Sequence, residues 1–295
     1  MVGESRPDRA TLELYALSNH GEVSAIDMSL LDNVMDYIWR NLMFDDKIAI
    51  VTGAASGIGE AVVHRLIGLR CRVVAFDRDA RGLASLASKL SAGALEDAVV
   101  VDISDEASVD EGVARAIGKA GRIDFLINSA GVDHLDRVAE CNLSDWRRVL
   151  SVNLDGTFLM CRIAVRHMIE RKGGRIVNVA SWLAKSGMAG HAPYAASKFG
   201  MLGLTQSLAK EVAEFGITVN AVCPGPIDHT RMRAEADQQS LARGLSPAKD
   251  RVKMIPLGRM GEPDDVAGLI AFLLSEDASY MTGQAINITG GLWMN

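Results

Sequence analysis

The sequence has few of the features that mark extracellular, membrane-bound or nucleic-acid-binding proteins. Its four cysteines lie far apart without a Cys-x-x-Cys pair, so neither a disulfide framework nor a metal site is predicted: Cys71, Cys141, Cys161 and Cys223. Its apolar runs are short and are broken by glycine or charge, so none could span a bilayer. The 31 basic and 37 acidic residues form no basic-aromatic patch, and we expect no binding to nucleic acid. Residues 1–15 lack the apolar core of a secretion signal, and we therefore expect a cytoplasmic protein.

From residue 47 onward the sequence contains a regular alternation of strand-like and helix-like segments. Apolar, β-rich runs predict strands over 47–53, 71–79, 97–104, 122–128, 174–181 and 216–225. Helical spacing of apolar residues falls between them, over 57–70, about 80–90, from about 105, over 144–170 and over 194–214. This alternation is typical of βαβ units, and strands that are apolar throughout indicate a sheet covered on both faces. We therefore predict an α/β fold with a doubly wound, Rossmann-type parallel sheet flanked by helices.

Residues 1–43 differ from the rest of the chain. They carry seven acidic and three basic residues, and their apolar residues fall on one helical stripe: Leu31, Val34, Met35, Ile38 and Leu42. We favour a partly disordered extension with one amphipathic helix packed on the body of the protein. The alternative is a docking element for an oligomer or a partner. Residues 44–295 are expected to form a single domain.

A glycine-rich turn, Thr52-Gly53-x3-Gly57-Ile58-Gly59, joins the first predicted strand to the first predicted helix. Gly53 permits a tight turn, Gly57 lets the backbone approach a pyrophosphate, and Gly59 permits close packing of helix on strand. The amide groups at the start of the helix would then receive the phosphates. Because turns commonly contain glycine, it is the position between strand and helix that predicts a dinucleotide site.

Asp77 ends the second predicted strand, about 20 residues beyond these glycines. A carboxylate there can accept hydrogen bonds from an adenosine ribose and would repel a 2′-phosphate, so NAD is favoured over NADP. A solvated loop carboxylate is the alternative interpretation. Arg78 follows and could pair with a phosphate, which leaves NADP open.

Tyr194 and Lys198 lie four positions apart, so a helix would stack their side chains on one face. A free tyrosine has a pKa of about 10, too high for a base near neutral pH. The positive charges of Lys198 and of an oxidised nicotinamide would favour the phenolate and lower that pKa. A pair of solvated surface residues would show the same spacing, so the remaining motifs must decide between the two interpretations.

Those motifs resemble the short-chain dehydrogenase/reductase family from about Phe44 to the C-terminus. The glycine turn is similar to the family's cofactor turn, and Asn128-Ser129-Ala130-Gly131 is similar to its Asn-Asn-Ala-Gly motif, with serine in second place. Four further residues match its catalytic tetrad, in the order Asn153, Ser181, Tyr194 and Lys198. The resemblance also covers the pair Asp102-Ile103, beside the adenine, and Pro224-Gly225, after the sixth strand.

The resemblance implies a role for each residue of the tetrad. Tyr194 is the acid and base, Ser181 donates a hydrogen bond to the reacting oxygen, and Lys198 also binds the nicotinamide ribose. Asn153 holds a water that links Lys198 to solvent; a buried structural asparagine is the alternative. The implied cofactor contacts are Gly53, Ser56, Gly57, Ile58, Gly59, Asp77, Asp102, Ile103, Asn128, Ala130, Gly131, Tyr194, Lys198, Pro224, Gly225 and Ile227.

One segment departs from the family pattern. His229 stands where the family commonly has a threonine, and Thr230 follows one position later, which puts the threonine's contact with the nicotinamide in doubt. We expect a lid over residues 227–258 that contributes polar and apolar groups to a substrate: Asp228, His229, Arg231, Met232 and Arg233. The turn after Ser181 is expected to add Trp182, Leu183, Met188 and His191.

The predicted reaction interconverts a secondary alcohol and a ketone by hydride transfer with NAD(H). Acyl-carrier-protein reductases of the family tend to carry basic residues at two places that here hold Lys172 and Phe215. Because one of the two is lost, we favour a small polyol, sugar or cyclic alcohol over a 3-oxoacyl-carrier-protein substrate. A non-catalytic dinucleotide sensor is the alternative of another class.

We also expect self-association, as a homotetramer or a dimer. Two predicted helices carry more apolar residues than one sheet face would cover, namely Val149, Leu150, Val152, Phe158 and Met160 in one and Met201, Leu204, Leu208 and Val212 in the other. The family resemblance implies contacts between subunits through these helices.

Overall fold

A computed structural model of the chain describes residues 43–244 and 246–295. The amphipathic helix expected near the N-terminus lies outside the described residues. Phe44–Asn295 forms one compact unit. No helix in the described part of the chain combines the length and the apolar character needed to cross a membrane.

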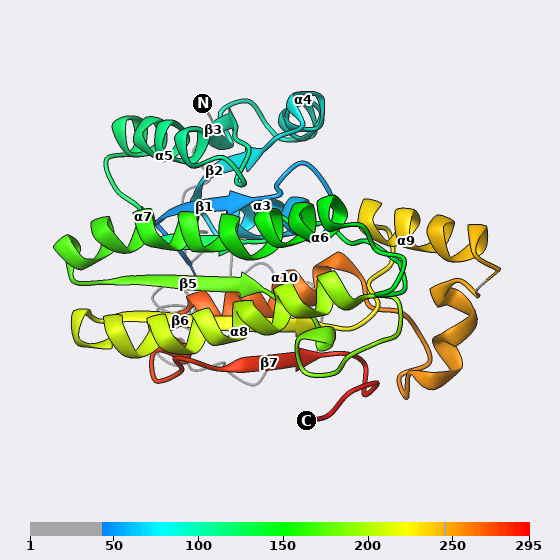
Figure 1. Cartoon of the computed structure of the whole chain (residues 1–295). Helices are drawn as coiled ribbons and strands as arrows, with labels where there is room; N and C mark the ends of the chain where they lie inside the picture. The colour runs from blue at the N-terminus through cyan, green and yellow to red at the C-terminus, as the bar shows by residue number, and fades with distance from the viewer. Residues whose placement is uncertain (1–42, 245) are drawn as a thin grey trace, which may run out of the picture. The chain divides into compact units, whose positions relative to one another are not determined.

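The core of this unit is a seven-stranded parallel sheet, in the order β3-β2-β1-β4-β5-β6-β7 (Figure 1). Its strands are β1 (Ile48–Thr52), β2 (Arg72–Asp77), β3 (Leu95–Val100), β4 (Phe125–Asn128), β5 (Gly174–Val179), β6 (Ile217–Pro224) and β7 (Ala285–Ile288). Strands β1, β4 and β6 are buried along their whole length, because helices cover both faces of the sheet. The predicted doubly wound α/β fold is confirmed.

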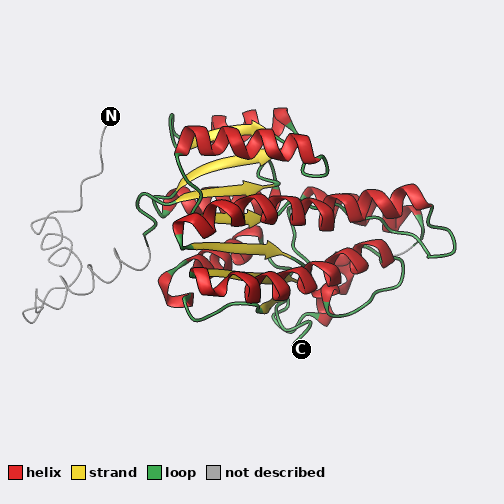
Figure 2. Cartoon of the chain, turned by 60° about the vertical axis from the view of Figure 1, so that its left-hand side comes forward, coloured by secondary structure: helices red, strands yellow, loops and turns green. Residues whose placement is uncertain are grey.

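Helices lie on both faces of the sheet, and in Figure 2 the strands run between two layers of helices. The α-helices are α3 (Gly57–Gly68), α4 (Ala80–Lys89), α5 (Glu106–Ala120), α6 (Leu143–Leu150), α7 (Gly156–Arg171), α8 (Ala192–Val212), α9 (Arg231–Ala242) and α10 (Pro263–Leu274). Shorter helical turns are η2 (Trp182–Ala184), η3 (Ala213–Phe215), η4 (Ala248–Met254) and η5 (Glu276–Ala278). One apolar core joins the sheet to α3 and α10, and a second joins it to α5, α7 and α8.

The starts of several helices are fixed by side chains that the sequence supplies at the expected positions. Asp79 accepts from the backbone of Arg81 and Gly82 at the start of α4, and Asp105 accepts from that of Ala107 at the start of α5. These carboxylates satisfy amide groups that have no partner within the helix. These caps therefore fix the residues at which α4 and α5 begin, close to the carboxyl ends of β2 and β3.

The helix predicted over 144–170 is interrupted. A π-helical segment, η1 (Ser151–Asp155), separates α6 from α7. Asn153, within this segment, is fully buried, and both its side-chain oxygen and its nitrogen bond to the backbone of Val132, 2.8 and 2.9 Å away. The wider turn therefore coincides with a long-range contact that apolar spacing along the helix cannot reveal.

Candidate active site

A cavity of about 500 Å³ is lined by residues at the carboxyl ends of the strands and by residues of α9. Figure 1 shows α9 at this end of the sheet. This is where open parallel α/β sheets bind ligands. Its wall contains all the predicted cofactor contacts but one, namely Gly53, Ser56, Gly57, Ile58, Gly59, Asp77, Asp102, Ile103, Ala130, Gly131, Tyr194, Lys198, Pro224, Gly225 and Ile227. Ser181 lies in the same wall, so residues from six strands and their following loops meet at one site.

The glycine turn has the close packing that a dinucleotide cradle requires. Gly53 has a φ of 66°, and a β-carbon there would lie 2.7 Å from the Cα of Ala130. A β-carbon on Gly59 would lie 2.1 Å from the carbonyl oxygen of Gly53, which only glycine permits. Thr52 Oγ1 accepts from the amides of Ser129 and Ala130 and so joins this turn to the loop after β4. The residues present fit a bound dinucleotide, whose phosphates would lie at the start of α3.

Asp77 lies at the end of β2, in the cavity wall beside Arg78. Its two oxygens accept from the amides of Ala55 and Asp79, at 3.0 and 2.9 Å. A carboxylate has about four acceptor positions, so capacity remains for a ribose hydroxyl. The backbone contacts fix the direction of the carboxylate, which is only 7% exposed.

Tyr194 enters the cavity from the first turn of α8 and packs with Val149 and Leu183 in an apolar cluster. Burial raises the pKa of the Tyr194 hydroxyl above its ordinary value, and the nearby Asp133 raises it further. A hydrogen bond with Ser181 lowers that pKa. Ser181 is itself held by a bond of 3.1 Å from the amide of Leu183 to its Oγ.

Lys198 lies one turn along α8, with Nζ 5.6 Å from the centre of the Tyr194 ring. Its ammonium group donates to the carbonyl of Val179 at 2.7 Å, and burial lowers its pKa from 10.5 to about 8. For the protein alone, burial has the largest effect on the Tyr194 hydroxyl and raises its pKa. The lowering expected from Lys198 together with an oxidised nicotinamide stays a prediction.

Asn153 and Asn128 are outside the cavity wall. Asn153 donates to Ser197 Oγ at 3.0 Å as well as bonding to Val132, so it joins α8 to the loop after β4. Asn128 is buried at the end of β4 and donates to Asn178 Oδ1 at 2.9 Å. Their side-chain contacts fit a role in holding the loops together. The water contact implied for Asn153 and the cofactor contact implied for Asn128 stay predictions.

The lid departs from the family pattern as the sequence indicates. Thr230 lies in the cavity wall and caps α9 by accepting from the amide of Arg233, whereas His229 is outside the wall with a side chain 72% exposed. Arg231, Met232 and Arg233 line the cavity, as expected, and Asp228 does not. The threonine is therefore displaced by one position rather than lost.

Asp133 is a cavity residue that the sequence interpretation missed. It follows the Asn128–Gly131 motif by two positions, on the loop at the carboxyl end of β4. This position could have indicated that Asp133 lies in the site, because the carboxyl ends of neighbouring parallel strands meet at one edge of the sheet. The side chains of Trp182, Leu183, Met188 and His191 also line the cavity, as expected.

Comparisons with known proteins show similarity over most of the chain. The family model described as enoyl-(acyl carrier protein) reductase matches residues 53–293. A hydroxy(phenyl)methylsuccinyl-CoA dehydrogenase subunit of Thauera aromatica is 39% identical over 83% of this chain and 96% of its own. A 3-oxoacyl-acyl-carrier-protein reductase of Thermotoga maritima is 38% identical over 85% of this chain and 99% of its own. D-threitol dehydrogenase of Mycolicibacterium smegmatis is 38% identical over 84% of this chain and 93% of its own.

Among solved structures, levodione reductase is similar in fold and in sequence. It superimposes with a TM-score of 0.80 and is 32% identical. The similarity covers 84% of this chain and 98% of that one. The two proteins therefore share the fold of the described domain.

Proposed function

The chain belongs to the short-chain dehydrogenase/reductase family, and we propose that it interconverts a secondary alcohol and a ketone with NAD(H). The family implies a nicotinamide dinucleotide as the cofactor. The observation that carries the proposal is the meeting of Tyr194, Ser181 and Lys198 in one cavity with the glycine turn. Fold alone would not carry it, because one fold hosts many functions.

In the proposed mechanism the protein's own residues handle the proton, and a bound nicotinamide would supply the acceptor or donor of the hydride at the carbinol carbon. Ser181 donates to the substrate oxygen and holds it beside the phenol of Tyr194. During oxidation Tyr194, as phenolate, takes the hydroxyl proton, and during reduction it returns a proton to the carbonyl oxygen. Lys198, with the charge of the oxidised cofactor, favours the phenolate and offsets the effect of burial.

Asp77 supports NAD as the preferred cofactor. A 2′-phosphate at the end of β2 would meet a carboxylate of the same sign that the amides of Ala55 and Asp79 hold in place. Arg78 favours NADP, but its side chain can turn towards solvent whereas Asp77 cannot. Like charges this close cost several kcal/mol, which exceeds the gain expected from a mobile cation.

A small polyol, sugar or cyclic alcohol fits the substrate end of the cavity. Apolar groups there come from Trp182, Leu183, Met188 and Met232, and polar groups come from His191 and other loop residues. Such a surface suits a ring or a carbon chain that bears hydroxyls. The similarity to D-threitol dehydrogenase favours the same class.

The experiment is a panel of secondary alcohols incubated with the purified protein and NAD, with NADH formation followed by absorbance. Cyclic alcohols, linear polyols and sugars form three arms, and the same alcohols with NADP form the matched control. We expect NADH with at least one arm. Tight binding of NAD without oxidation of any alcohol would contradict the proposal and favour a non-catalytic sensor.

A 3-oxoacyl-carrier-protein reductase activity is the second candidate, favoured by the similarity to the Thermotoga maritima reductase. Of the two positions where such reductases tend to carry basic residues for the acidic carrier, one holds Lys172, at the end of α7, and the other holds Phe215. Reduction of acetoacetyl-carrier protein with NADH or NADPH tests this candidate. A rate above that with the free ketones, lowered by Lys172→Glu, would establish it in place of the small substrate.

A cytoplasmic homotetramer is the proposed state of the protein. Several residues of the expected interface are buried within the subunit, so they cannot form it: Val149, Met160, Met201, Leu208 and Val212. Phe158 on α7 and Phe199 on α8 are 45% and 47% exposed, and they support contacts through the same two helices. Large exposed aromatic side chains are common where proteins associate.

A further inference from the structure

Two side chains from different loops form a hydrogen-bonded pair in the substrate half of the cavity. His191 Nδ1 lies 3.0 Å from Asp133 Oδ2, and the two side chains are 10% and 14% exposed. Both residues line the cavity together with Tyr194, which is three positions beyond His191. Neither belongs to the tetrad, so the proposed proton transfer leaves this pair without a role.

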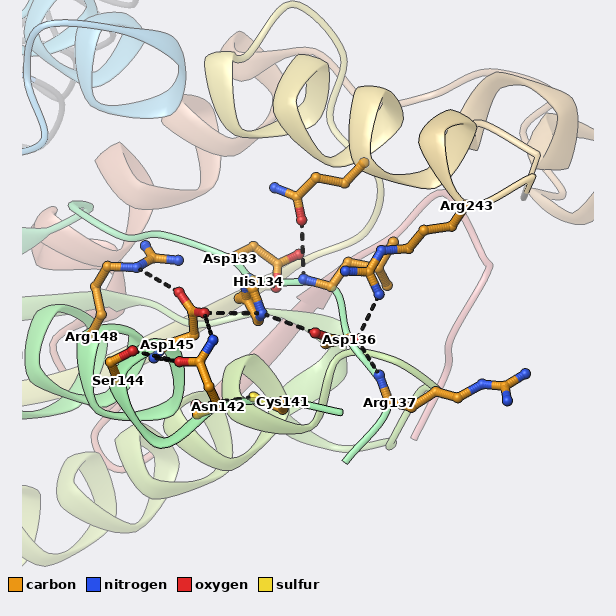
Figure 3. Close-up of polar contacts among 12 residues, drawn as sticks. Asp133, His134, Asp136, Arg137, Cys141, Asn142, Ser144, Asp145, Arg148 and Arg243 are labelled. Carbon is orange, nitrogen blue, oxygen red and sulfur yellow. Dashed lines mark hydrogen bonds and ion pairs between the residues drawn. The ribbon is translucent and has the colours of Figure 1, made fainter. Parts of the chain in front are cut away.

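The loop that carries Asp133 is fixed by contacts on several sides (Figure 3). The ring of His134 lies between the carboxylates of Asp136 and Asp145, 3.7 Å from each. Asp136 also accepts from Arg243, beyond the end of α9, at 2.8 Å. These contacts join the loop that follows Asp133 to α6 and to the end of α9.

The segment that carries His191 is joined to the same loop. The amide of Asp136 donates to the carbonyl of Gly190 at 2.8 Å, and Asp136 and His191 form a parallel bridge. Asp133 Oδ1 accepts from the amide of His134 at 2.7 Å, which leaves Oδ2 for the imidazole. Backbone contacts between the two segments therefore hold Asp133 and His191 next to each other.

Asp133 determines which nitrogen of His191 carries the proton. A carboxylate oxygen can only accept, so Nδ1 is the donor in the hydrogen bond between them. In the neutral ring Nε2 then carries a lone pair and acts as an acceptor. Among the described residues, Nε2 of His191 has no hydrogen-bond partner, whereas its ring lies in the cavity wall.

We propose that His191 is a specificity-determining residue that accepts a hydrogen bond, through Nε2, from a second hydroxyl of the substrate next to the reacting carbon. Asp133 is its positioning residue. The inference rests on the proposed alcohol oxidation and narrows its substrates to compounds with vicinal hydroxyls. A substrate carboxylate at this place would meet the charge of Asp133, so the pair favours a neutral donor over an anion.

The test compares two alcohols that differ only in the second hydroxyl: the trans vicinal diol of cyclohexane, and cyclohexanol. Both are oxidised with NAD in alkaline buffer, and the readout is the ratio of their kcat/KM values. Two variants separate the functions of the two ring nitrogens. His191→Asn keeps an amide donor near the position of Nδ1, where it can bond to Asp133, but has no atom at Nε2. His191→Gln places its amide near the position of Nε2.

The diol to cyclohexanol ratio is expected to fall about tenfold in His191→Asn, as the loss of one hydrogen bond predicts. Because the readout is a ratio, a loss of kcat/KM common to both alcohols cancels, and His191→Gln should keep most of the wild-type ratio. Far-ultraviolet circular dichroism and NAD binding check that both variants fold.

An unchanged ratio in His191→Asn would overturn the inference, and so would an equal loss with both alcohols, which a structural role predicts. The alcohol-oxidation proposal would stand in either case. If the wild-type protein oxidises other alcohols of the panel but neither of these two compounds, the inference fails and alcohol oxidation stands. If it oxidises no alcohol at all, both fail.

Discussion

Replacing Lys198 by methionine is expected to change the pH dependence of stability as well as abolish turnover. Lys198 is 3% exposed on α8, and burial lowers its pKa from 10.5 to about 8. Methionine has a similar length without a charge, so Lys198→Met removes the buried ammonium and keeps most of the packing. The variant separates the cost of burying this group from its use in the reaction.

The size of the effect follows from the pKa. One unit of pKa corresponds to about 1.4 kcal/mol, so the change from 10.5 to about 8 corresponds to about 3 kcal/mol. Between those two pH values the unfolded chain binds the proton and the folded chain does not, so wild-type stability rises with pH. Below a pH of about 8, Lys198 is charged in both the folded and the unfolded state, and burial of its ammonium group then destabilises the folded protein by the full amount. Lys198→Met lacks this dependence.

A second contribution of Lys198 does not vary with pH in this way. The variant leaves the carbonyl of Val179 without its partner at 2.7 Å, which costs about 1–3 kcal/mol at every pH. The effect of the buried charge is therefore measured by how the difference in free energy of unfolding between the wild type and Lys198→Met changes with pH.

Urea unfolding of both proteins without cofactor, at one protein concentration, measures this quantity at neutral pH and at pH values approaching 10.5. Relative to the variant, the wild type should gain about 3 kcal/mol across that range. A difference that is constant with pH would refute the argument that a buried ammonium opposes folding here.

The remaining predictions concern the cofactor site and the subunit contacts. We expect kcat/KM to be at least ~10-fold higher with NAD than with NADP. Asp77→Ala should narrow or reverse this preference through the KM for the cofactor, and the control Arg78→Ala should widen it. Equal kcat/KM values in the wild type would point to Arg78 as the dominant residue. Gly59→Ala should weaken NAD binding by at least ~10-fold in calorimetry, because its β-carbon would lie 2.1 Å from the Gly53 carbonyl, whereas Gly68→Ala, with no atom within 4 Å, should have little effect. Light scattering should give a tetramer that Phe158→Glu with Phe199→Glu dissociates, and a stable wild-type monomer at micromolar concentration would contradict this.

The parts of the fold that depend on local pattern could be predicted from the sequence. Apolar, β-rich runs identified six of the seven strands, and three of these, β1, β4 and β6, are buried along their whole length. The end strand β7, Ala285–Ile288, has four half-buried residues and gives no comparable signal. Tyr194 and Lys198 could be identified because their spacing places them on one helix face and because the other motifs of the chain resemble those of the family.

The parts that depend on distant segments could not be predicted in the same way. The π-helical turn at Ser151–Asp155 coincides with the bonds of Asn153 to Val132, 21 positions away. Asp133 and His191 meet only because two loops after neighbouring strands are joined, 58 positions apart. The burial that raises the pKa of Tyr194 in the protein alone could not be predicted either, because the apolar cluster around its ring joins side chains of α6, η2 and α8.

The central claim is that Tyr194 transfers the proton during alcohol oxidation, and Tyr194→Phe tests it most directly. The variant removes one oxygen and keeps the ring that packs with Val149 and Leu183. With an alcohol that the wild type oxidises, we expect NAD affinity to stay within about twofold and kcat to fall by about 10²–10⁴. A variant that binds NAD equally well and keeps a kcat close to that of the wild type would contradict the account.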